Sequence, residues 1–523
     1  MQFVSLGLRE EHGVRGVEGL KVRSTLATVL VAIVLAASSV GTFSIATKSA
    51  GMSDAHEIIT VRLDGSPSER GLYYGSVARD AIAENLEGFW NQAESLGFSK
   101  HDLKSRASEM EGSQPDRMVE ELRAMAAGAG IDYLELLAMN LFYSTFDHSD
   151  GCTNLVAAGS GTVNGQTLAS KNRDASKTNV LLIVEPSETT HGFVAVGGAD
   201  EWGISFGLND VGLCEGNNWM PVPAYDANGI GEMSLNRLVL EMCSSVDHAI
   251  SYVDTVLKRG GSTVMVADSK KAAFIETVPT IYVPDTVAYM VINGAAVHTN
   301  HYVYEPFRSW ALSGSFGYFW GPSVARFDRA TELVEQLKGD LTSDLVMTFT
   351  RDLEDFGNSK PQELKAAHPE IPSDLWTFGW PGNSICNAAT VSAGVFEIDP
   401  KYPRLLSTMW MSVYNPAWCM YVPVHNAVIR TSQLAMAGYD SYVDGSVWGD
   451  AENIRNSGTY EWGDLVPTFD IWEASWIQQT SSGENDAARM IKAKHVEDAC
   501  LLLAELDIGI SQDAYGLLQS LPG

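Results

Sequence analysis

Cys152 is the residue of this chain best placed to act as a nucleophile. It follows Gly151 at the point where a helical pattern gives way to a strand pattern. An Asn164-Gly165 pair then predicts a hairpin turn, and the return strand ends in Lys171-Asn172-Arg173-Asp174. These side chains would return toward Cys152, where they could orient an amine, lower the pKa of a thiol and polarise a carbonyl group. The residues alone leave open a simpler alternative, a polar strand end that faces water.

A second candidate nucleophile, Ser205, lies in Gly203-Ile204-Ser205-Phe206-Gly207, which formally matches GxSxG. The nucleophile elbow of an α/β-hydrolase needs a buried strand before the serine and a helix after it. Here two acidic residues, Asp200 and Glu201, precede the motif, and a turn at 208–210 follows it. We therefore predict that this match is incidental.

Other residues that could bind a metal do not form a recognised ligand set. His298 and His301 make an HxxH pair, but no Asp or Glu completes a standard arrangement, so both are predicted to be structural. The six cysteines lie far apart, with neither a CxxC pair nor finger-like spacing. Cys386 is interpreted as a buried structural thiol. No metal or cofactor is expected.

The composition indicates a globular protein with an acidic surface. A hydrophobic share of 45% and 13 Trp provide ample core, and a formal charge of −30 disfavours binding to nucleic acid or to anionic lipid. The N-terminus differs, because Lys21 and Arg23 precede an uncharged, largely apolar stretch at 24–47. Residues 1–47 are therefore predicted to be a signal peptide, with a membrane anchor as the alternative, and the protein is expected to be secreted.

The remaining sequence mixes strands and helices in an order that does not alternate. A helix is predicted to start near Ser68 and further helices to continue toward 151, whereas residues from 152 onward are rich in strands and hairpins, including one that turns at 268–269. The last hundred residues are predicted to be less regular, with one helix near 486–506. This order predicts an α+β layered fold with a mostly antiparallel sheet.

Several motifs occur in the order typical of a known family. The chain resembles the autoproteolytic acyl-coenzyme A:6-aminopenicillanic acid acyltransferases and, more distantly, choloylglycine hydrolases and N-terminal-nucleophile (Ntn) dipeptidases. The resemblance runs from about Ile58 to Pro423, and its specificity comes from shared order and spacing. It is carried by GSPSERGLYYG (65–75), Gly151-Cys152-Thr153, Asn172-Arg173-Asp174, GLNDVGLCEGNN (207–218), VHTNHY (297–302), RDLEDF (351–356) and Asn383-Ser384-Ile385-Cys386.

This resemblance implies an Ntn-hydrolase four-layer α/β/β/α sandwich with a helical prosegment. Residues 48–151 would be the prosegment, 152–425 the catalytic body and 426–523 a C-terminal extension packed on it. The Cys152 thiol would cleave the bond after Gly151, which frees an α-amine suited to act as the general base of that thiol. The two chains would remain associated.

The resemblance also implies roles for single residues. Asp174 would hold the new amine, and Asn300 would donate to the oxyanion. Asn217 fits a dipeptidase-like alignment and Asn218 an acyltransferase-like one, with Asn218 preferred. Asn172 and Arg173 accompany Asp174 as candidate site residues, although Arg173 replaces an apolar or aromatic residue of the family.

The expected function is hydrolysis or transfer of an acyl group at a linear amide through a Cys152 thioester, with a small-molecule amide or acyl thioester as substrate. A dipeptidase or other peptidase is the alternative enzyme, because residues 405–424 resemble the C-terminal strands of those enzymes. A secreted binding protein that has lost catalysis is a third possibility, since a fold alone does not define function.

Overall fold

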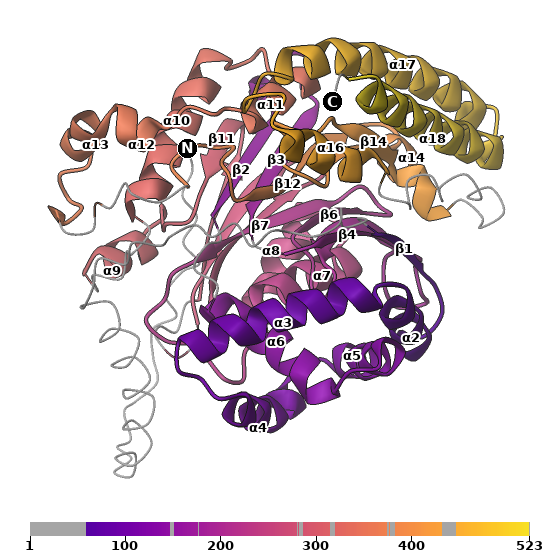
Figure 1. Ribbon diagram of the computed structural model, residues 1–523. Helices are drawn as coiled ribbons and strands as arrows, with labels where there is room; N and C mark the ends of the chain where they lie inside the picture. The colour runs from indigo at the N-terminus through magenta and orange to yellow at the C-terminus, as the bar shows by residue number, and fades with distance from the viewer. Residues whose placement is uncertain are drawn as a thin grey trace, which may run out of the picture.

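Two β-sheets stacked face to face form the centre of the molecule (Figure 1). A computed structural model describes residues 59–146, 151–175, 177–279, 281, 286–313, 320–373, 376, 382–430 and 446–521. Within these residues the larger sheet has eight strands, in the order β1 (Ile59–Leu63), β4 (Asn179–Val184), β5 (Phe193–Gly198), β6 (Phe206–Asn209), β7 (Cys214–Met220), β8 (Gly261–Ala267), β9 (Ala272–Thr277) and β10 (Val287–Ile292). The smaller sheet has six, in the order β11 (Gly294–His298), β2 (Cys152–Ala158), β3 (Thr167–Asp174), β12 (Thr390–Ile398), β13 (Thr408–Ser412) and β14 (Val422–His425).

Strand pairing is antiparallel in both sheets except where β1 lies parallel to β4. The prediction of mostly antiparallel sheets is therefore confirmed. Every residue of β4, β5 and β8 is buried, so these strands are covered on both faces. β10 belongs to the larger sheet and β11 to the smaller one, so the chain passes from one sheet to the other at Asn293.

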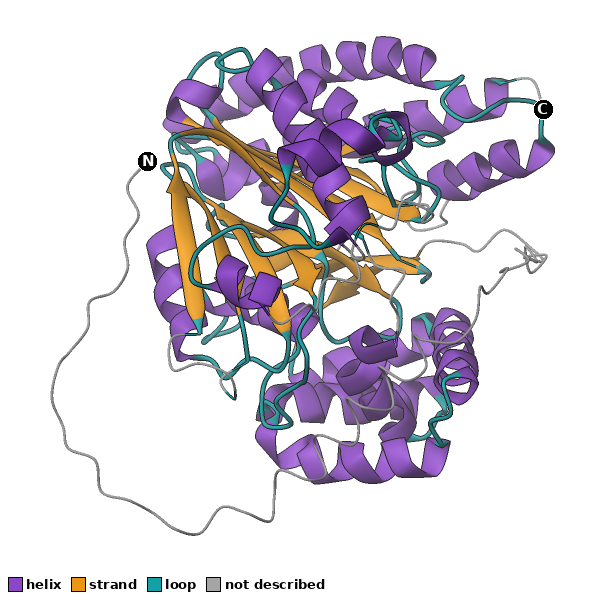
Figure 2. Cartoon of the chain, turned by 90° about the vertical axis from the view of Figure 1, so that its left-hand side faces the viewer, coloured by secondary structure: helices purple, strands orange, loops and turns teal. Residues whose placement is uncertain are grey.

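Helices cover the outer face of each sheet, which gives the expected four-layer α/β/β/α arrangement (Figure 2). Helices α7 (Glu232–Met242) and α8 (Val246–Thr255) pack on the larger sheet, and α10 (Trp320–Gln336) and α11 (Ser343–Thr350) pack on the smaller one. Shorter helices lie in the connections, namely α9 (Phe307–Ser313), α12 (Phe356–Ser359), α13 (Pro361–Ala367) and α14 (Pro403–Leu406).

The segment before Cys152 forms a helical cluster on the side of the larger sheet (Figure 1). Its helices are α2 (Pro67–Val77), α3 (Arg79–Ser95), α4 (Lys100–Met110), α5 (Asp116–Ala129) and α6 (Tyr133–Phe146). The predicted helix near Ser68 is present as α2, which begins with a capping box between Ser66 and Glu69. Gly71 and Gly75 let α2 approach α5, since a Cβ on either would lie about 2 Å from a carbonyl oxygen of α5.

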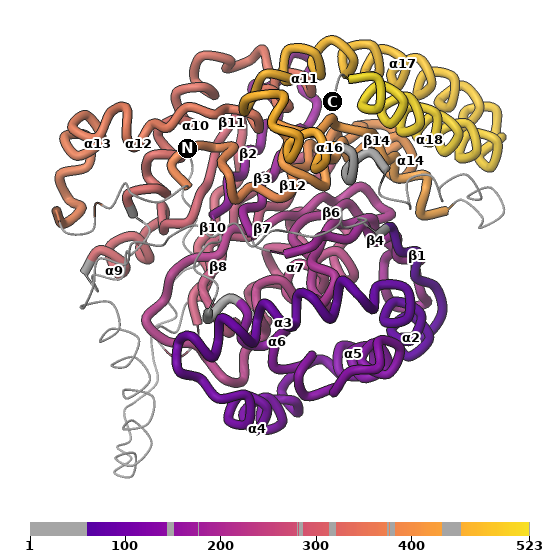
Figure 3. The backbone as a smooth tube through the Cα atoms, in the orientation of Figure 1, coloured from indigo at the N-terminus to yellow at the C-terminus, as the bar shows by residue number. Residues whose placement is uncertain are grey.

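The C-terminal region is more regular than the sequence predicted. It contains α16 (Ser446–Ser457) and two long helices, α17 (Val466–Lys492) and α18 (Val496–Ser520), which pack together beside the smaller sheet (Figure 3). The single helix predicted at 486–506 is wrong, because the chain breaks at 493–495, where Lys494 has a φ of 69°. That left-handed conformation ends α17 and turns the chain back.

No helix among the described residues has the length and hydrophobicity needed to cross a membrane. The apolar stretch at 24–47, on which the signal-peptide prediction depends, lies outside the described residues.

Candidate active site

Cys152 is the first residue of β2 and lies in the centre of the molecule. Only 6% of it is exposed, and it faces Arg173 across the β2–β3 pair. Residues directly opposite one another in an antiparallel pair share a face of the sheet. The hairpin predicted from the Asn164-Gly165 turn therefore does bring the end of β3 beside Cys152.

The peptide bond between Gly151 and Cys152 is held by a hydrogen bond on each side. The Asp174 backbone N–H donates to the Gly151 carbonyl oxygen at 2.9 Å. The Cys152 N–H donates to Asn300 Oδ1 at 2.8 Å. These hydrogen bonds therefore fix both the Gly151 carbonyl oxygen and the Cys152 nitrogen. The Asp174 N–H also polarises the Gly151 carbonyl group.

Arg326, on α10, is a site residue that the sequence did not predict. Its buried guanidinium donates to the Cys152 carbonyl oxygen, to Thr153 Oγ1 at 3.1 Å and to Asn300 Oδ1 at 2.8 Å. Burial lowers the pKa of Arg326, whereas Asp174 and Cys152 act in the opposite direction. Nothing in the surrounding helical sequence distinguishes this arginine from one on a solvated helix face.

Lys171 supplies a second cation beside the thiol. Its ammonium donates to the backbone oxygen of Asn217 and to Asn218 Oδ1 at 3.2 Å. Burial lowers the pKa of Lys171, while Cys152 and then Asp174 raise it. Lys171 therefore places a hydrogen-bonding amino group beside the Cys152 thiol.

The two neighbouring asparagines of β7 lie on opposite faces of the larger sheet. Asn218 points toward the smaller sheet, because it also donates to the Thr299 carbonyl oxygen at 2.9 Å. Successive side chains of a strand alternate in direction, so Asn217 points toward the helical layer. The preference for Asn218 as the amide of the site agrees with this placement.

Asp174 and Asn300 both lie at Cys152, but their contacts differ from those expected. Asp174 accepts hydrogen bonds from Asn387 Nδ2 at 2.8 Å and Thr390 Oγ1 at 2.6 Å, and it is Asn300 that touches the Cys152 nitrogen. The Asn300 amide nitrogen, expected to donate to an oxyanion, donates to the Trp219 carbonyl oxygen at 2.8 Å. The donor to the carbonyl oxygen before Cys152 is instead the Asp174 backbone N–H.

Asn172 does not join the site, which corrects the expectation that all four residues at the end of β3 return toward Cys152. It lies opposite Thr153, and its amide donates to the carbonyl oxygens of Thr350 and Ile385 at 2.8 and 3.0 Å on the helical side. Arg173 does share the face of Cys152, but its guanidinium binds Asn179 Oδ1 at 3.0 Å and Glu201 Oε2 at 3.3 Å.

Three other sequence interpretations agree with the structure. His298 is buried and binds Glu276 at 2.8 Å, and His301 binds Ser323 Oγ at 2.7 Å, so both histidines brace the loop that carries Asn300. Cys386 is buried, and burial raises the pKa of its thiol well above the usual range. Ser205 is also buried and is followed by strand β6 rather than by a helix.

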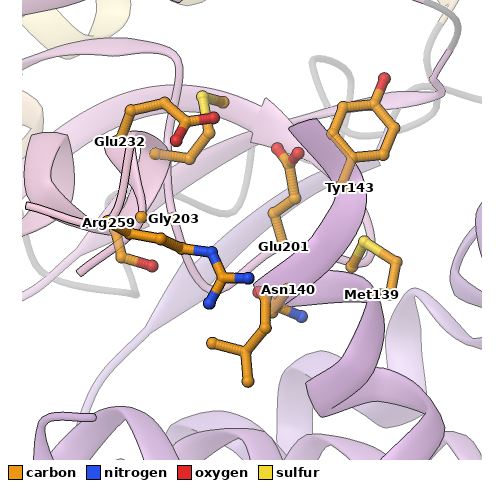
Figure 4. Close-up of a pocket in the computed structure, with 11 residues that line it drawn as sticks. Met139, Asn140, Tyr143, Glu201, Gly203, Glu232 and Arg259 are labelled. Carbon is orange, nitrogen blue, oxygen red and sulfur yellow. The ribbon is translucent and has the colours of Figure 1, made fainter. Parts of the chain in front are cut away.

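A small pocket lies where α6 meets the body of the protein (Figure 4). Met139 and Tyr143 line it from α6, and Glu201 and Arg259 line it from the body. Burial alone would raise the pKa of Glu201, but Lys177 and then Arg173 lower it to about 2. Because Glu201 also binds Arg173, which is opposite Cys152, the pocket is linked to the active site through that ion pair.

Together these groups suit acyl transfer. A buried thiol, an ammonium group beside it and a polarised carbonyl are the components of covalent catalysis through a thioester. With two stacked sheets between helical layers, they define an enzyme of the Ntn acyl hydrolase and acyltransferase class, which acts on amides.

Sequence comparison finds similar proteins within this class. The family model of acyl-coenzyme A:6-aminopenicillanic acid acyl-transferase matches residues 162–377. The 40 kDa form of acyl-coenzyme A:6-aminopenicillanic-acid acyltransferase from Emericella nidulans is 25% identical over 262 residues, which cover 47% of this chain and 69% of that protein. Over this region the chain is similar to the acyltransferase family, in agreement with the resemblance of its motifs.

Solved structures give more distant matches. An N-acylethanolamine-hydrolyzing acid amidase ortholog from Caenorhabditis elegans has 16% identity and a TM-score of 0.30 over 48% of this chain and 94% of that one. Penicillin V acylase from Agrobacterium tumefaciens has 16% identity and a TM-score of 0.29 over 52% of this chain and 86% of that one. A conjugated bile acid hydrolase from Clostridium perfringens has 13% identity and a TM-score of 0.28 over 52% of this chain and 92% of that one.

Proposed function

We propose that the protein cleaves itself between Gly151 and Cys152 and then uses Cys152 to hydrolyse or transfer acyl groups from linear amides. The observation that supports this most directly is the pair of hydrogen bonds that hold the Gly151 carbonyl oxygen at 2.9 Å and the Cys152 nitrogen at 2.8 Å. A bond held on both sides next to a thiol is prepared for attack by that thiol.

Self-cleavage begins when Cys152 Sγ attacks the Gly151 carbonyl carbon. The Asp174 N–H stabilises the negative oxygen that forms, and Lys171 lies beside the attacking sulfur. The C–N bond breaks as the Cys152 nitrogen gains a proton, which leaves Gly151 as a thioester on Sγ. Water then attacks the thioester, releases the Gly151 carboxylate and returns the thiol with a free α-amine on the same residue.

The mature enzyme repeats this chemistry on an external amide. The α-amine of Cys152 acts as the general base for its thiol. Asn300 Oδ1, which accepts a hydrogen bond from the Cys152 N–H before cleavage, holds that amine. The substrate's amide bond breaks, its amine leaves with a proton, and an acyl thioester remains on Cys152. Water or a second amine then takes the acyl group.

The family suggests the kinds of substrate to test. Its relatives are named for acyl-coenzyme A with 6-aminopenicillanic acid, for N-acylethanolamines, for penicillin V and for conjugated bile acids. We propose a small-molecule amide or acyl thioester of this kind as the substrate. Free dipeptides remain the alternative, and a non-catalytic binding protein is opposed by the presence of Cys152, Lys171, Asp174 and Asn300 in one site.

Comparison of two cysteine variants tests the proposal. Wild-type protein should show a new N-terminus at Cys152 by intact mass and N-terminal sequencing, and Cys152→Ala should remain one chain. Cys500→Ala is a matched control, because Cys500 is also 6% exposed but lies on α18. A wild-type protein that hydrolyses amides yet never shows this N-terminus would overturn self-processing.

We also propose that residues 1–47 direct export, on the basis of the basic and then apolar sequence. N-terminal sequencing of protein from the culture medium should find the segment removed, or find it retained in a membrane fraction if it is an anchor. Protein with Met1 intact in the soluble cytoplasmic fraction would contradict this proposal.

A further inference from the structure

Gly151 is packed so closely that residue 151 has no room for a side chain. A Cβ added to Gly151 would lie 2.5 Å from Asp174 Oδ2 and 3.2 Å from Arg326 Nη2. Non-bonded carbon and oxygen atoms do not approach to 2.5 Å, so the Asp174 carboxylate would have to move, and Arg326 would have to move by a few tenths of an ångström. The freedom of Asp174 and Arg326 to move therefore decides how strictly a side chain at residue 151 is excluded.

Asp174 is held in place by its own hydrogen bonds. Its two carboxylate oxygens accept from Asn387 Nδ2 at 2.8 Å and from Thr390 Oγ1 at 2.6 Å, and the side chain is buried. Its backbone N–H is bound to the Gly151 carbonyl oxygen as well. A shift of the carboxylate would break contacts in a buried site, where unsatisfied polar groups are costly.

Arg326 is equally constrained. Its guanidinium donates to Gly382 O at 2.7 Å, to Thr153 Oγ1 at 3.1 Å, to Asn300 Oδ1 at 2.8 Å and to the Cys152 carbonyl oxygen. These acceptors lie on separate segments of the chain. The planar guanidinium therefore cannot rotate away from Gly151 without losing several bonds at once.

The restriction at Gly151 bears on substrates because self-cleavage and catalysis pass through the same chemical species. In each case an acyl group is joined to Cys152 Sγ as a thioester, and its α-carbon follows the carbonyl carbon. During self-cleavage that α-carbon is the Gly151 Cα. We propose that Cys152 accepts acyl groups whose α-carbon is an unsubstituted CH2, such as linear alkanoyl groups, and excludes those with a substituent placed as the methyl of L-alanine.

This inference rests on the proposed function, and it selects among the substrates left open above. The aminoacyl group of an L-dipeptide carries a Cβ at this position unless it is glycyl. Linear N-acyl amides carry only a hydrogen at this position of the α-carbon. The geometry at Gly151 therefore favours acyl amides over ordinary dipeptides.

Matched acyl donors test the proposal on the mature enzyme. Hexanoyl p-nitroanilide is compared with the two enantiomers of 2-methylhexanoyl p-nitroanilide, which share its leaving group. The rate of acyl-Cys152 formation, followed by intact mass and nitroaniline release, should fall ~10-fold or more for the enantiomer that corresponds to L-alanine. Equal rates for all three donors would overturn the proposal, whereas failure of hexanoyl itself to form any adduct would overturn the proposed function.

Self-cleavage provides a second test that needs no external substrate. Gly151→Ala should slow the appearance of the Cys152 N-terminus ~10-fold or more, because it places the Cβ against Asp174 and Arg326. Gly88→Ala on α3 is the matched control, since a Cβ there meets nothing within 4 Å and should leave cleavage unchanged. Both variants are checked for a wild-type melting temperature. Cleavage of folded Gly151→Ala at the wild-type rate would contradict the proposal.

Discussion

At the scale of single residues, the site is organised around the nitrogen and the carbonyl oxygen of Cys152. Asn300 Oδ1 accepts the N–H, and Arg326 binds both Asn300 Oδ1 and the carbonyl oxygen. The two side chains thus fix the backbone of the nucleophile as well as its surroundings. This arrangement places Asn300 where it could hold the α-amine that the proposed cleavage would free.

Asn300→Ala should therefore slow both self-cleavage and amide turnover by ~10²-fold, because the base is no longer oriented. The measurement is the rate of appearance of the Cys152 N-terminus and the kcat of the processed fraction, with circular dichroism to confirm folding. Unchanged values for both rates in a folded variant would reassign Asn300 to a structural role.

Asn217→Ala and Asn218→Ala provide a paired comparison of adjacent residues. Asn218 binds Lys171 and the Thr299 carbonyl oxygen, so its loss should lower kcat by ~10-fold or more. Asn217 turns toward the helices, and its variant should keep near-normal kcat. The reverse order of effects would support the dipeptidase-like alignment.

The sequence predicted part of this site, and the reasons for the misses are physical. The hairpin turn predicts that Lys171, Arg173 and the backbone of Asp174 lie close to Cys152. The Asn172 side chain lies on the other face of the sheet, because neighbouring residues of a strand alternate in direction. Arg326 reaches Cys152 only through the packing of α10 on the sheet, and no local pattern reports such a contact.

At the scale of elements, the C-terminal helices are joined to the core by buried charges. Arg351, which follows α11, binds Glu473 on α17 through two nitrogens at 2.6 and 2.7 Å. These helices were underestimated from the sequence because their burial depends on partners far along the chain rather than on a strong periodic pattern. Arg351 itself was recognised only as part of a motif.

Glu473→Ala should lower the free energy of unfolding by ~3 kcal/mol, because the buried Arg351 keeps only the more exposed Asp470, at 3.2 Å, as a carboxylate partner. Urea unfolding provides the measurement. Glu335→Ala, which breaks an exposed pair with Lys338 at 3.1 Å, should cost ~0.5 kcal/mol or less. If Glu473→Ala lowered the free energy of unfolding no more than Glu335→Ala does, the Arg351–Glu473 pair would not anchor α17.

A second buried pair predicts a pH dependence. Burial alone would lower the pKa of His425, but Asp507 on α18, at 2.6 Å, and Glu484 on α17 raise it to about 10. The unfolded histidine has a pKa of ~6.5. The stabilisation is therefore fully present below pH ~6.5 and is lost as the pH rises toward 10.

Thermal melting should show this loss between pH 7 and pH 10 as a falling melting temperature in wild-type protein. His425→Gln should reduce the slope, since the variant has no proton to lose at that position. His495→Gln is the control, because His495 is exposed and its replacement should leave the wild-type slope. Identical slopes for His425→Gln and wild type would exclude His425 as the source.

At the scale of the whole molecule, the segment before Cys152 is part of the folded core. Glu121 of α5 binds Arg237 of α7 at 2.7 and 2.9 Å, with both side chains buried. Asn140 of α6 donates to the Asp200 carbonyl oxygen at 2.9 Å and accepts from the Trp202 N–H at 2.8 Å. These contacts do not depend on the bond between Gly151 and Cys152.

The processed protein should therefore elute as a single particle that contains both chains in native size-exclusion chromatography. The chains should separate only after a denaturant unfolds the protein, and mass spectrometry of the peak identifies them. Separation of the two chains in native buffer would show that the segment before Cys152 is a removable propeptide.

The parallel pairing of β1 with β4 affects how the protein can refold. β1 precedes Cys152 and β4 follows it, so one sheet is built from both sides of the proposed cleavage point. In the intact chain, β1 and β4 pair within one molecule, and the folding rate does not depend on protein concentration. If the chain is cleaved as proposed, refolding becomes a second-order encounter between two chains, so the cleaved protein should rarely recover after it unfolds in dilute solution.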